Sequence, residues 1–113
     1  MSQKSVSVLL SIMLGGLCLQ ASADTVMVKY RGMLDLANLQ CEWVTRSSLI
    51  RRLCYDKATQ YVVVSLNGTY YHYCGVTPAI VSAWRSAESM GQYFNAAIKG
   101  RYDCRLSPPP PYR

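Results

Sequence analysis

Cysteine and histidine are the residue types in this chain that could carry nucleophilic or metal chemistry. Cys74 lies two residues after His72, a spacing that places both side chains on one face of a strand. A thiol beside an imidazole is the arrangement of an activated nucleophile. No pair of cysteines has the C-x-x-C spacing of a zinc site, and His72 is the single histidine of the sequence. The pattern therefore favours structural disulfides over a metal site, and we predict no cofactor.

The N-terminal segment indicates which compartment the thiols meet. The apolar run Val6–Leu19 has 14 residues, whereas a membrane-spanning helix needs about 20. Ala21-Ser22-Ala23 then fits a signal peptidase site, with cleavage before Asp24. We predict that residues 1–23 are a signal peptide and that the protein is exported, either periplasmic or secreted. A membrane anchor and a lipoprotein signal ending at Cys18 are the alternatives.

Export would turn an odd number of cysteines into an even one. Of the 113 residues 23 would be removed, leaving 90 residues and four cysteines: Cys41, Cys54, Cys74 and Cys104. In an oxidising compartment we expect these to form two disulfides. An oxidised Cys74 cannot attack a substrate, and the sequence gives no obvious acid to orient His72. The sequence therefore predicts a protein that is not an enzyme.

The mature chain is basic. Without Lys4 it has 11 Lys and Arg against 6 Asp and Glu, a net charge of +5. Such a surface attracts nucleic acid, anionic lipid or acidic glycans. A surface that only keeps the protein soluble is the simpler interpretation, because no run of consecutive charges occurs.

Alternating hydrophobicity predicts a small antiparallel sheet. We expect strands at 25–31 (ended by Gly32), 49–55, 60–66 and 69–74, and the pattern of residues 33–44 is mixed. Asn67-Gly68 is typical of a two-residue type I′ turn, which would pair Leu66 with Thr69 and so fix the register of this hairpin. One face of the hairpin then carries Val62, Val64, Tyr71 and Tyr73.

Helical signals follow the strands. Thr77-Pro78 is a good helix start, and Ser89 can cap a second helix over residues 90–98 that ends at Gly100. The predicted fold is α+β: an antiparallel β-meander, stapled by disulfides, with two C-terminal helices packed on one face.

The register also constrains the disulfides. A four-residue turn at 56–59 would place Cys54 opposite Tyr61, which also faces Cys74 across the next hairpin. The two cysteines would then lie about 10 Å apart, beyond the roughly 7 Å between Cα atoms that a disulfide allows. We therefore expect each of them to bond to Cys41 or Cys104 rather than to the other.

Four short motifs carry a family resemblance. Ser47-Ser48, Leu53-Cys54-Tyr55-Asp56, Tyr71-His72-Tyr73 and the run from Gly91 to Tyr102 resemble, in order and spacing, the features of the KTSC domain family. This family is a small domain of unestablished function that also occurs at the C-terminus of some lysyl-tRNA synthetases, and RNA binding has been suggested for it. The resemblance covers residues 47–106, which leaves an N-terminal extension at 24–46 and a proline-rich tail at 107–113. We expect this tail to be disordered.

Candidate binding residues are polar, basic and aromatic side chains that we expect to be exposed. We select five of them: Asn95, Arg101, Tyr102, Arg51 and Arg52. Tyr71 and Tyr73 could stack on bases, but their register with Val62 and Val64 favours the core.

The leading hypothesis from the sequence is an exported, non-catalytic binding or structural module with no membrane span after cleavage. Its partner would be an anionic envelope component or another protein. The second hypothesis is a nucleic-acid (RNA) binding domain, which export disfavours. An enzyme relying on His72 is the third.

Overall fold

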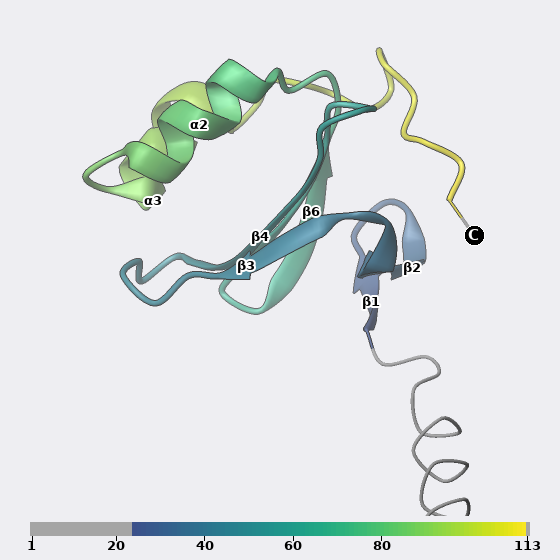
Figure 1. Cartoon of the computed structure of the whole chain (residues 1–113), viewed down its shortest axis with the longest axis horizontal. Helices are drawn as coiled ribbons and strands as arrows, with labels where there is room; N and C mark the ends of the chain where they lie inside the picture. Colours follow the sequence, from purple (N-terminus) through teal and green to yellow (C-terminus); the bar gives the residue numbers. More distant parts are fainter. Residues whose placement is uncertain (1–23, 113) are drawn as a thin grey trace, which may run out of the picture.

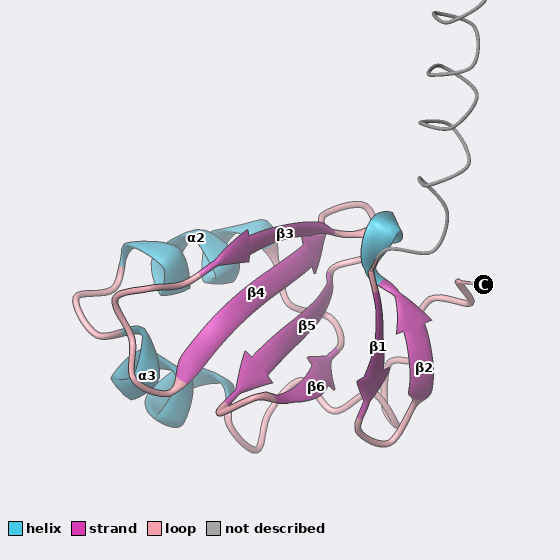
Figure 2. Ribbon diagram, turned by 90° about the horizontal axis from the view of Figure 1, so that it is seen from below, coloured by secondary structure: helices cyan, strands magenta, loops and turns pink. Residues whose placement is uncertain are grey.

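The computed structural model describes residues 24–112, so the predicted signal peptide lies outside the described residues. These residues form one mixed sheet of six strands in the order β2-β1-β6-β5-β4-β3, followed by short helices. Figure 2 shows the curved, half-barrel-like sheet with both helices beside it. The strands are β1 (Thr25–Val28), β2 (Gly32–Asp35), β3 (Gln40–Trp43), β4 (Ile50–Asp56), β5 (Tyr61–Leu66) and β6 (Thr69–Tyr73).

The four strands β3 to β6 pair with their neighbours along the chain, all antiparallel. The β5–β6 turn has positive φ at Asn67 (52°) and Gly68 (90°), as a type I′ turn requires. It pairs Leu66 with Thr69 and Val62 with Tyr73, the register expected from the sequence. A two-residue turn thus places Tyr71 and Tyr73 on the same face of β6.

The N-terminal extension differs from the expectation. The strand predicted over 25–31 ends at Val28, and Gly32, predicted to break it, begins β2 instead. Tyr30 has a φ of 68°, which is unusual for an aromatic residue, and the chain reverses direction there. The alternating hydrophobic pattern of residues 25–31 therefore includes a hairpin turn and is not one continuous strand. β1 also pairs in parallel with β6 at Val28 and Tyr70, and the sheet is therefore mixed rather than wholly antiparallel.

The helical region begins where the caps predict. Thr77 accepts a hydrogen bond from the Ile80 amide to cap α2 (Pro78–Ser86), and Ser89 accepts one from Gln92 to cap α3 (Met90–Tyr93). The second helix continues as a π-helical segment, η2 (Phe94–Ile98), before Gly100 at φ of 75°. A single 3-10 turn, η1 (Leu36–Asn38), joins β2 to β3.

Two hydrophobic cores stabilise the domain, one on each face of the sheet. The first packs the helices against β4 and β5 through residues such as Leu53, Val62 and the fully buried Trp84. Trp84 also donates a 3.1 Å hydrogen bond from its indole nitrogen to the Met90 carbonyl oxygen. The second lies on the opposite face and includes Val28 and Tyr61, so the N-terminal extension is part of the folded domain.

Two disulfides cross-link the second face. They join Cys41 to Cys54 and Cys74 to Cys104, so Cys54 and Cys74 bond to other partners as expected. The register behind that expectation is wrong by two residues, because Cys54 pairs with Val63 and not with Tyr61. The turn after β4 spans residues 57–60 rather than 56–59, with Gln60 in the left-handed region at φ of 57°, and this shift of one residue moves each strand pairing by two.

The proline-rich tail is ordered against the sheet, contrary to the expectation of a disordered end. Tyr112 packs on the second core and its hydroxyl donates to the Asp56 carboxylate. Arg31 donates a 2.7 Å hydrogen bond to the Pro110 carbonyl oxygen, and its guanidinium contacts the rings of both Tyr61 and Tyr112. An aromatic residue near the end of the tail supplies the buried area that prolines alone lack. Figure 1 shows the tail, in yellow, near the β1–β2 hairpin and far from the helices.

Candidate functional site

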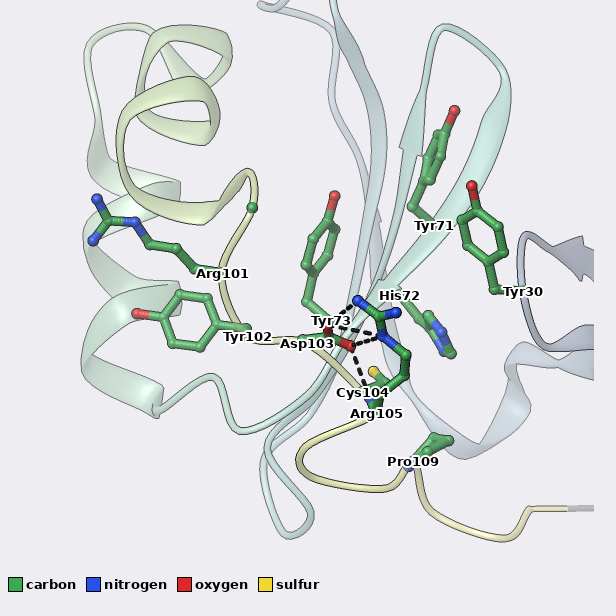
Figure 3. A pocket seen from close by; sticks show the side chains of 11 residues that line it. Tyr30, Tyr71, His72, Tyr73, Arg101, Tyr102, Asp103, Cys104, Arg105 and Pro109 are labelled. Carbon is green, nitrogen blue, oxygen red and sulfur yellow. Dashed lines mark hydrogen bonds and ion pairs between the residues drawn. The ribbon is translucent and has the colours of Figure 1, made fainter.

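The main candidate site is a groove of about 730 Å³ along the side of β6 that faces away from β5. Three segments form it: β6, the tip of the β1–β2 hairpin, and residues 100–109 after the helices. Figure 3 shows these segments and the side chains that line the groove. We call it the tyrosine groove; its lining residues are Tyr30, Tyr71, His72, Tyr73, Gly100, Arg101, Tyr102, Asp103, Cys104, Arg105 and Pro109.

Three tyrosines form a row along the groove. Tyr71 and Tyr73 are two residues apart on β6 and therefore project from one face, and Tyr30 projects from the hairpin tip in the same direction (Figure 3). Tyr30 is 87% exposed. Tyr73 packs edge-on against Phe94 of η2, which holds its ring in place. The prediction that both β6 tyrosines are core residues is thus wrong for Tyr71, which is only partly buried and lies in neither core.

The C-terminal side of the groove is a tight turn fixed to β6. Gly100 and Tyr102 both have positive φ, 75° and 57°, which turns the chain away from η2. The Cys74 amide donates a 2.9 Å hydrogen bond to the Tyr102 carbonyl oxygen, and the Cys74–Cys104 disulfide lies two residues further on. Residues 101–105 are thus held at the end of β6 by one hydrogen bond and one covalent bond.

The charges of the groove are few and partly matched. Arg105 donates to both oxygens of Asp103, with a shortest contact of 2.7 Å, and these hydrogen bonds lower the pKa of Asp103 to about 2. Asp103 is therefore ionised at neutral pH. Arg101 is exposed and forms no ion pair with a described residue. The groove accordingly combines aromatic rings with a small net positive charge.

The main chain of β6 offers hydrogen-bonding groups to the groove. The Tyr70 carbonyl accepts from the Lys29 amide and the Cys74 amide donates to Tyr102, so even-numbered residues of β6 face away from β5. His72 lies between them, and its amide and carbonyl must face the same way. Within residues 24–112 neither group has a hydrogen-bond partner, because β1 ends before it reaches His72. A short length of sheet edge is therefore open inside the groove.

The imidazole of His72 points to the second face of the sheet. Its Nδ1 lies 2.8 Å from the Tyr61 hydroxyl, and burial together with the nearby Arg31 lowers the pKa of His72. Burial also raises the pKa of Tyr61. His72 is therefore neutral at pH 7 and its orienting partner is a phenol. Since Cys74 is bonded to Cys104, the predicted Cys–His pair is no thiol nucleophile.

The structure separates the five predicted binding residues. Arg101 and Tyr102 line the tyrosine groove. Asn95 is exposed on η2 and Arg51 is exposed on β4, and neither lines the groove.

The prediction that Arg52 is an exposed binding residue is wrong. It is 8% exposed, and its guanidinium donates to both carboxylate oxygens of Asp24 at 2.9 and 2.7 Å while lying 4.4 Å from the centre of the Trp43 ring. Successive residues of a strand point to opposite faces. Of the two adjacent arginines on β4, Arg51 is therefore exposed to solvent while Arg52 is buried.

Tyr30, Asp103 and Arg105 are among the groove residues that the sequence analysis did not select. Tyr30 was assigned to a strand rather than to a hairpin tip. The short spacing of Asp103 and Arg105, on either side of a cysteine, could have indicated a local ion pair.

Other features of the described residues are less suggestive. A second cavity of about 420 Å³ lies between the β4–β5 turn and α2, lined by polar residues including Gln40, Asp56 and Arg85. Within residues 24–112, no three histidine, cysteine or acidic side chains gather closely enough to hold a metal ion. No helix in that range has the length and apolar character to cross a membrane.

Comparison with known proteins confirms the resemblance seen in the sequence. The model of the KTSC domain family matches residues 46–102. An uncharacterized protein of Stutzerimonas stutzeri is 36% identical over 58 residues, which cover 50% of this chain and 82% of that protein. A lysine–tRNA ligase of Nostoc punctiforme is 34% identical over 56 residues, 49% of this chain but only 10% of the ligase.

A solved structure agrees with this match. The crystal structure of a KTSC domain protein from Yersinia pestis superposes with a TM-score of 0.54 and 29% identity, covering 57% of this chain and 92% of that chain. The matched family segment contains β6 and residues up to Tyr102. Tyr30 and residues 103–109 of the groove lie outside it.

Proposed function

Because the chain belongs to the KTSC domain family, we propose that it is a small exported binding module without catalytic activity, and that the tyrosine groove is its binding site. The observation that carries the proposal is the row of three tyrosine rings on one side of an open groove. Aromatic rings that lie exposed in a concave site are typical of ligand recognition, since burying them against a ligand removes apolar area from water.

Export is supported by the cysteines and by the position of Asp24. All four cysteines of the mature chain are within bonding distance of a partner, with S–S distances of 2.04 and 2.13 Å. Such disulfides persist in oxidising compartments. Asp24, which would be the first residue after cleavage, is held by Arg52, so the residue that follows the predicted cleavage site is part of the folded domain.

The absence of catalysis is supported by the chemistry of the groove. The sulfur of Cys104 is bonded, and the imidazole of His72 is held by Tyr61 on the face away from the tyrosine row. The one carboxylate in the lining, Asp103, is ionised and paired with Arg105, which suits it poorly to general acid catalysis.

Nucleic-acid binding is the second candidate. Tyr71 and Tyr73 occupy alternate positions on a strand, the arrangement by which sheet-based RNA-binding domains stack successive bases. The similarity to a segment of a lysine–tRNA ligase also favours RNA. Export disfavours it, and the lining of the groove includes few free cations.

Export is tested on the protein as the cell makes it. We expect the intact mass of the isolated protein to correspond to a chain beginning at Asp24 with two disulfides, recovered outside the cytoplasm. A full-length chain with free thiols in the cytoplasm would refute export and the disulfides together.

The binding site is tested by co-sedimentation with isolated envelope material from the exporting cell. We expect the disulfide-bonded protein to pellet with this material, and Tyr71→Ala to reduce the bound fraction at least tenfold. Trp43→Ala is the matched control, since Trp43 is an exposed aromatic residue on β3, three strands from β6. Equal losses in both variants, or none in Tyr71→Ala, would remove the groove from the proposed function.

A further inference from the structure

We propose that the tyrosine groove binds a chain of N-acetylated amino sugars. This inference rests on the proposed function, and it names the ligand class by the three kinds of group that the groove presents: aromatic faces, an unpaired main-chain amide with its carbonyl, and one unpaired cation.

The rings supply stacking surfaces. The axial C–H groups of a pyranose carry a partial positive charge that complements the electron-rich face of an aromatic ring. Tyr71 and Tyr73 are two residues apart on β6, a separation of about 7 Å along a strand. This is the scale of a sugar unit, and Tyr30 extends the row at the hairpin tip.

The sheet edge supplies recognition of the acetamido group. The amide and carbonyl of His72 face the groove without partners among residues 24–112. The N–H and C=O of a trans secondary amide point in opposite directions, so the acetamido oxygen can accept from the His72 amide while a neighbouring hydroxyl of the sugar chain donates to the His72 carbonyl. An extended peptide could also do so, but it would have to run along β6, where β1 blocks one end at Tyr70 and Tyr102 blocks the other. An acetamido substituent approaches β6 from the side, so it does not need a long stretch of free sheet edge.

The charges favour an uncharged backbone. Arg105 is matched by Asp103, which leaves Arg101 as the unpaired cation of the lining among residues 24–112. A single-stranded nucleic acid would bring one phosphate for each stacked base, and Asp103 would repel them. A glycan brings no obligatory charge, and Arg101 can meet one acidic substituent.

The test compares three hexamers on the disulfide-bonded protein by titration calorimetry. Chitohexaose carries acetamido groups, cellohexaose has the same type of β-1,4-linked sugar backbone without them, and hexauridylate represents nucleic acid. We expect chitohexaose to bind at least tenfold more tightly than cellohexaose, and Tyr71→Ala to weaken it at least tenfold while Trp43→Ala does not. Equal affinity for the two glycans, absence of chitohexaose binding, or tighter salt-sensitive binding of hexauridylate would each overturn the proposal.

Two variants at one position test the main-chain contact. His72→Pro removes an amide that faces away from β5, whereas His72→Ala keeps that amide and removes only the imidazole. We expect the preference for chitohexaose over cellohexaose to fall toward unity in His72→Pro and to persist in His72→Ala, with folding checked by thermal unfolding. Should His72→Pro fail to fold, the preference of the unmodified protein decides the question.

These results are distinguishable from failure of the proposed function. If envelope binding still depends on Tyr71 while chitohexaose does not bind, the groove is a binding site for another ligand and only the sugar assignment is overturned. If envelope binding is independent of Tyr71, the tyrosine groove is not the binding site.

Discussion

Removing the Cys74–Cys104 disulfide is expected to destabilise the protein more than removing Cys41–Cys54. The first closes a segment with a sequence separation of 30 residues and the second one of 13 residues. Cys41 and Cys54 are also direct partners across β3 and β4, so the sheet already holds them together. Cys74 and Cys104 join β6 to a segment without regular secondary structure.

The magnitudes follow from the chain entropy that each cross-link removes from the unfolded state. For the separations of 30 and 13 residues, the losses on double alanine substitution are about 3.6 and about 2.9 kcal/mol at 25 °C. A domain of this size has a free energy of unfolding of roughly 5–13 kcal/mol, so either loss is a large fraction. The larger one corresponds to a decrease in melting temperature of roughly 15–30 °C.

The assay is urea unfolding of the two double variants beside the unmodified protein, together with binding at the groove. We expect Cys74→Ala with Cys104→Ala to give the lower free energy of unfolding. In addition, it should weaken ligand binding under conditions where the protein remains folded, because a single hydrogen bond, from the Cys74 amide to the Tyr102 carbonyl, then joins this segment to the end of β6. Cys41→Ala with Cys54→Ala should leave binding unchanged. The reverse order of stability, or equal effects on binding, would refute this reasoning.

Three further predictions concern single residues. Tyr112→Phe removes a hydrogen bond to the ionised Asp56 and should lower the free energy of unfolding by about 1–2 kcal/mol, measured in urea. The hydrogen bond from Arg52 lowers the pKa of Asp24 below its usual 3.8, so its contribution to stability is present above pH 4 and is lost as the pH falls through the lowered value. Asp24→Asn should therefore reduce stability at pH 7 and flatten its decline below pH 4; an unchanged acid limb in thermal melts would contradict this. Gly68→Ala places a side chain at φ of 90° and should cost about 1–2 kcal/mol, and a variant as stable as the unmodified protein would exclude strain at this turn.

Local signals in the sequence predicted the parts of the fold in which a few neighbouring residues decide the conformation. Asn67-Gly68 sets the β5–β6 register because both residues tolerate positive φ. Thr77 and Ser89 begin the helices because their side chains accept otherwise unpaired amides. Gly100 ends the helical region because the chain there turns with positive φ.

Long-range contacts decide the features that the sequence analysis missed. The hairpin at Tyr30 was not predicted because no glycine, asparagine or proline marks its first residues. The parallel pairing of β1 with β6 joins residues 42 positions apart and leaves no local pattern. Burial of Arg52 depends on Asp24, 28 residues away, and docking of the tail depends on Tyr112 meeting Arg31 and Tyr61.

The candidate site was predicted only in part for the same reason. Arg101 and Tyr102 were chosen because they follow a helix cap, and they line the groove. Tyr30 and Tyr71, two of its other tyrosines, are 41 positions apart in the sequence, and only the folded sheet brings them together.

The docked tail has a consequence for the order of events during synthesis. Val28, Tyr61 and Tyr112 belong to one core, so its earliest and latest parts are separated by most of the chain. A polypeptide that emerges N-terminus first cannot close this core until residue 112 has left the ribosome. The helices and β4–β6 can form before that moment, whereas the second core stays exposed to solvent. Cys74 meanwhile can pair wrongly with Cys41 or Cys54 until Cys104 has been synthesised.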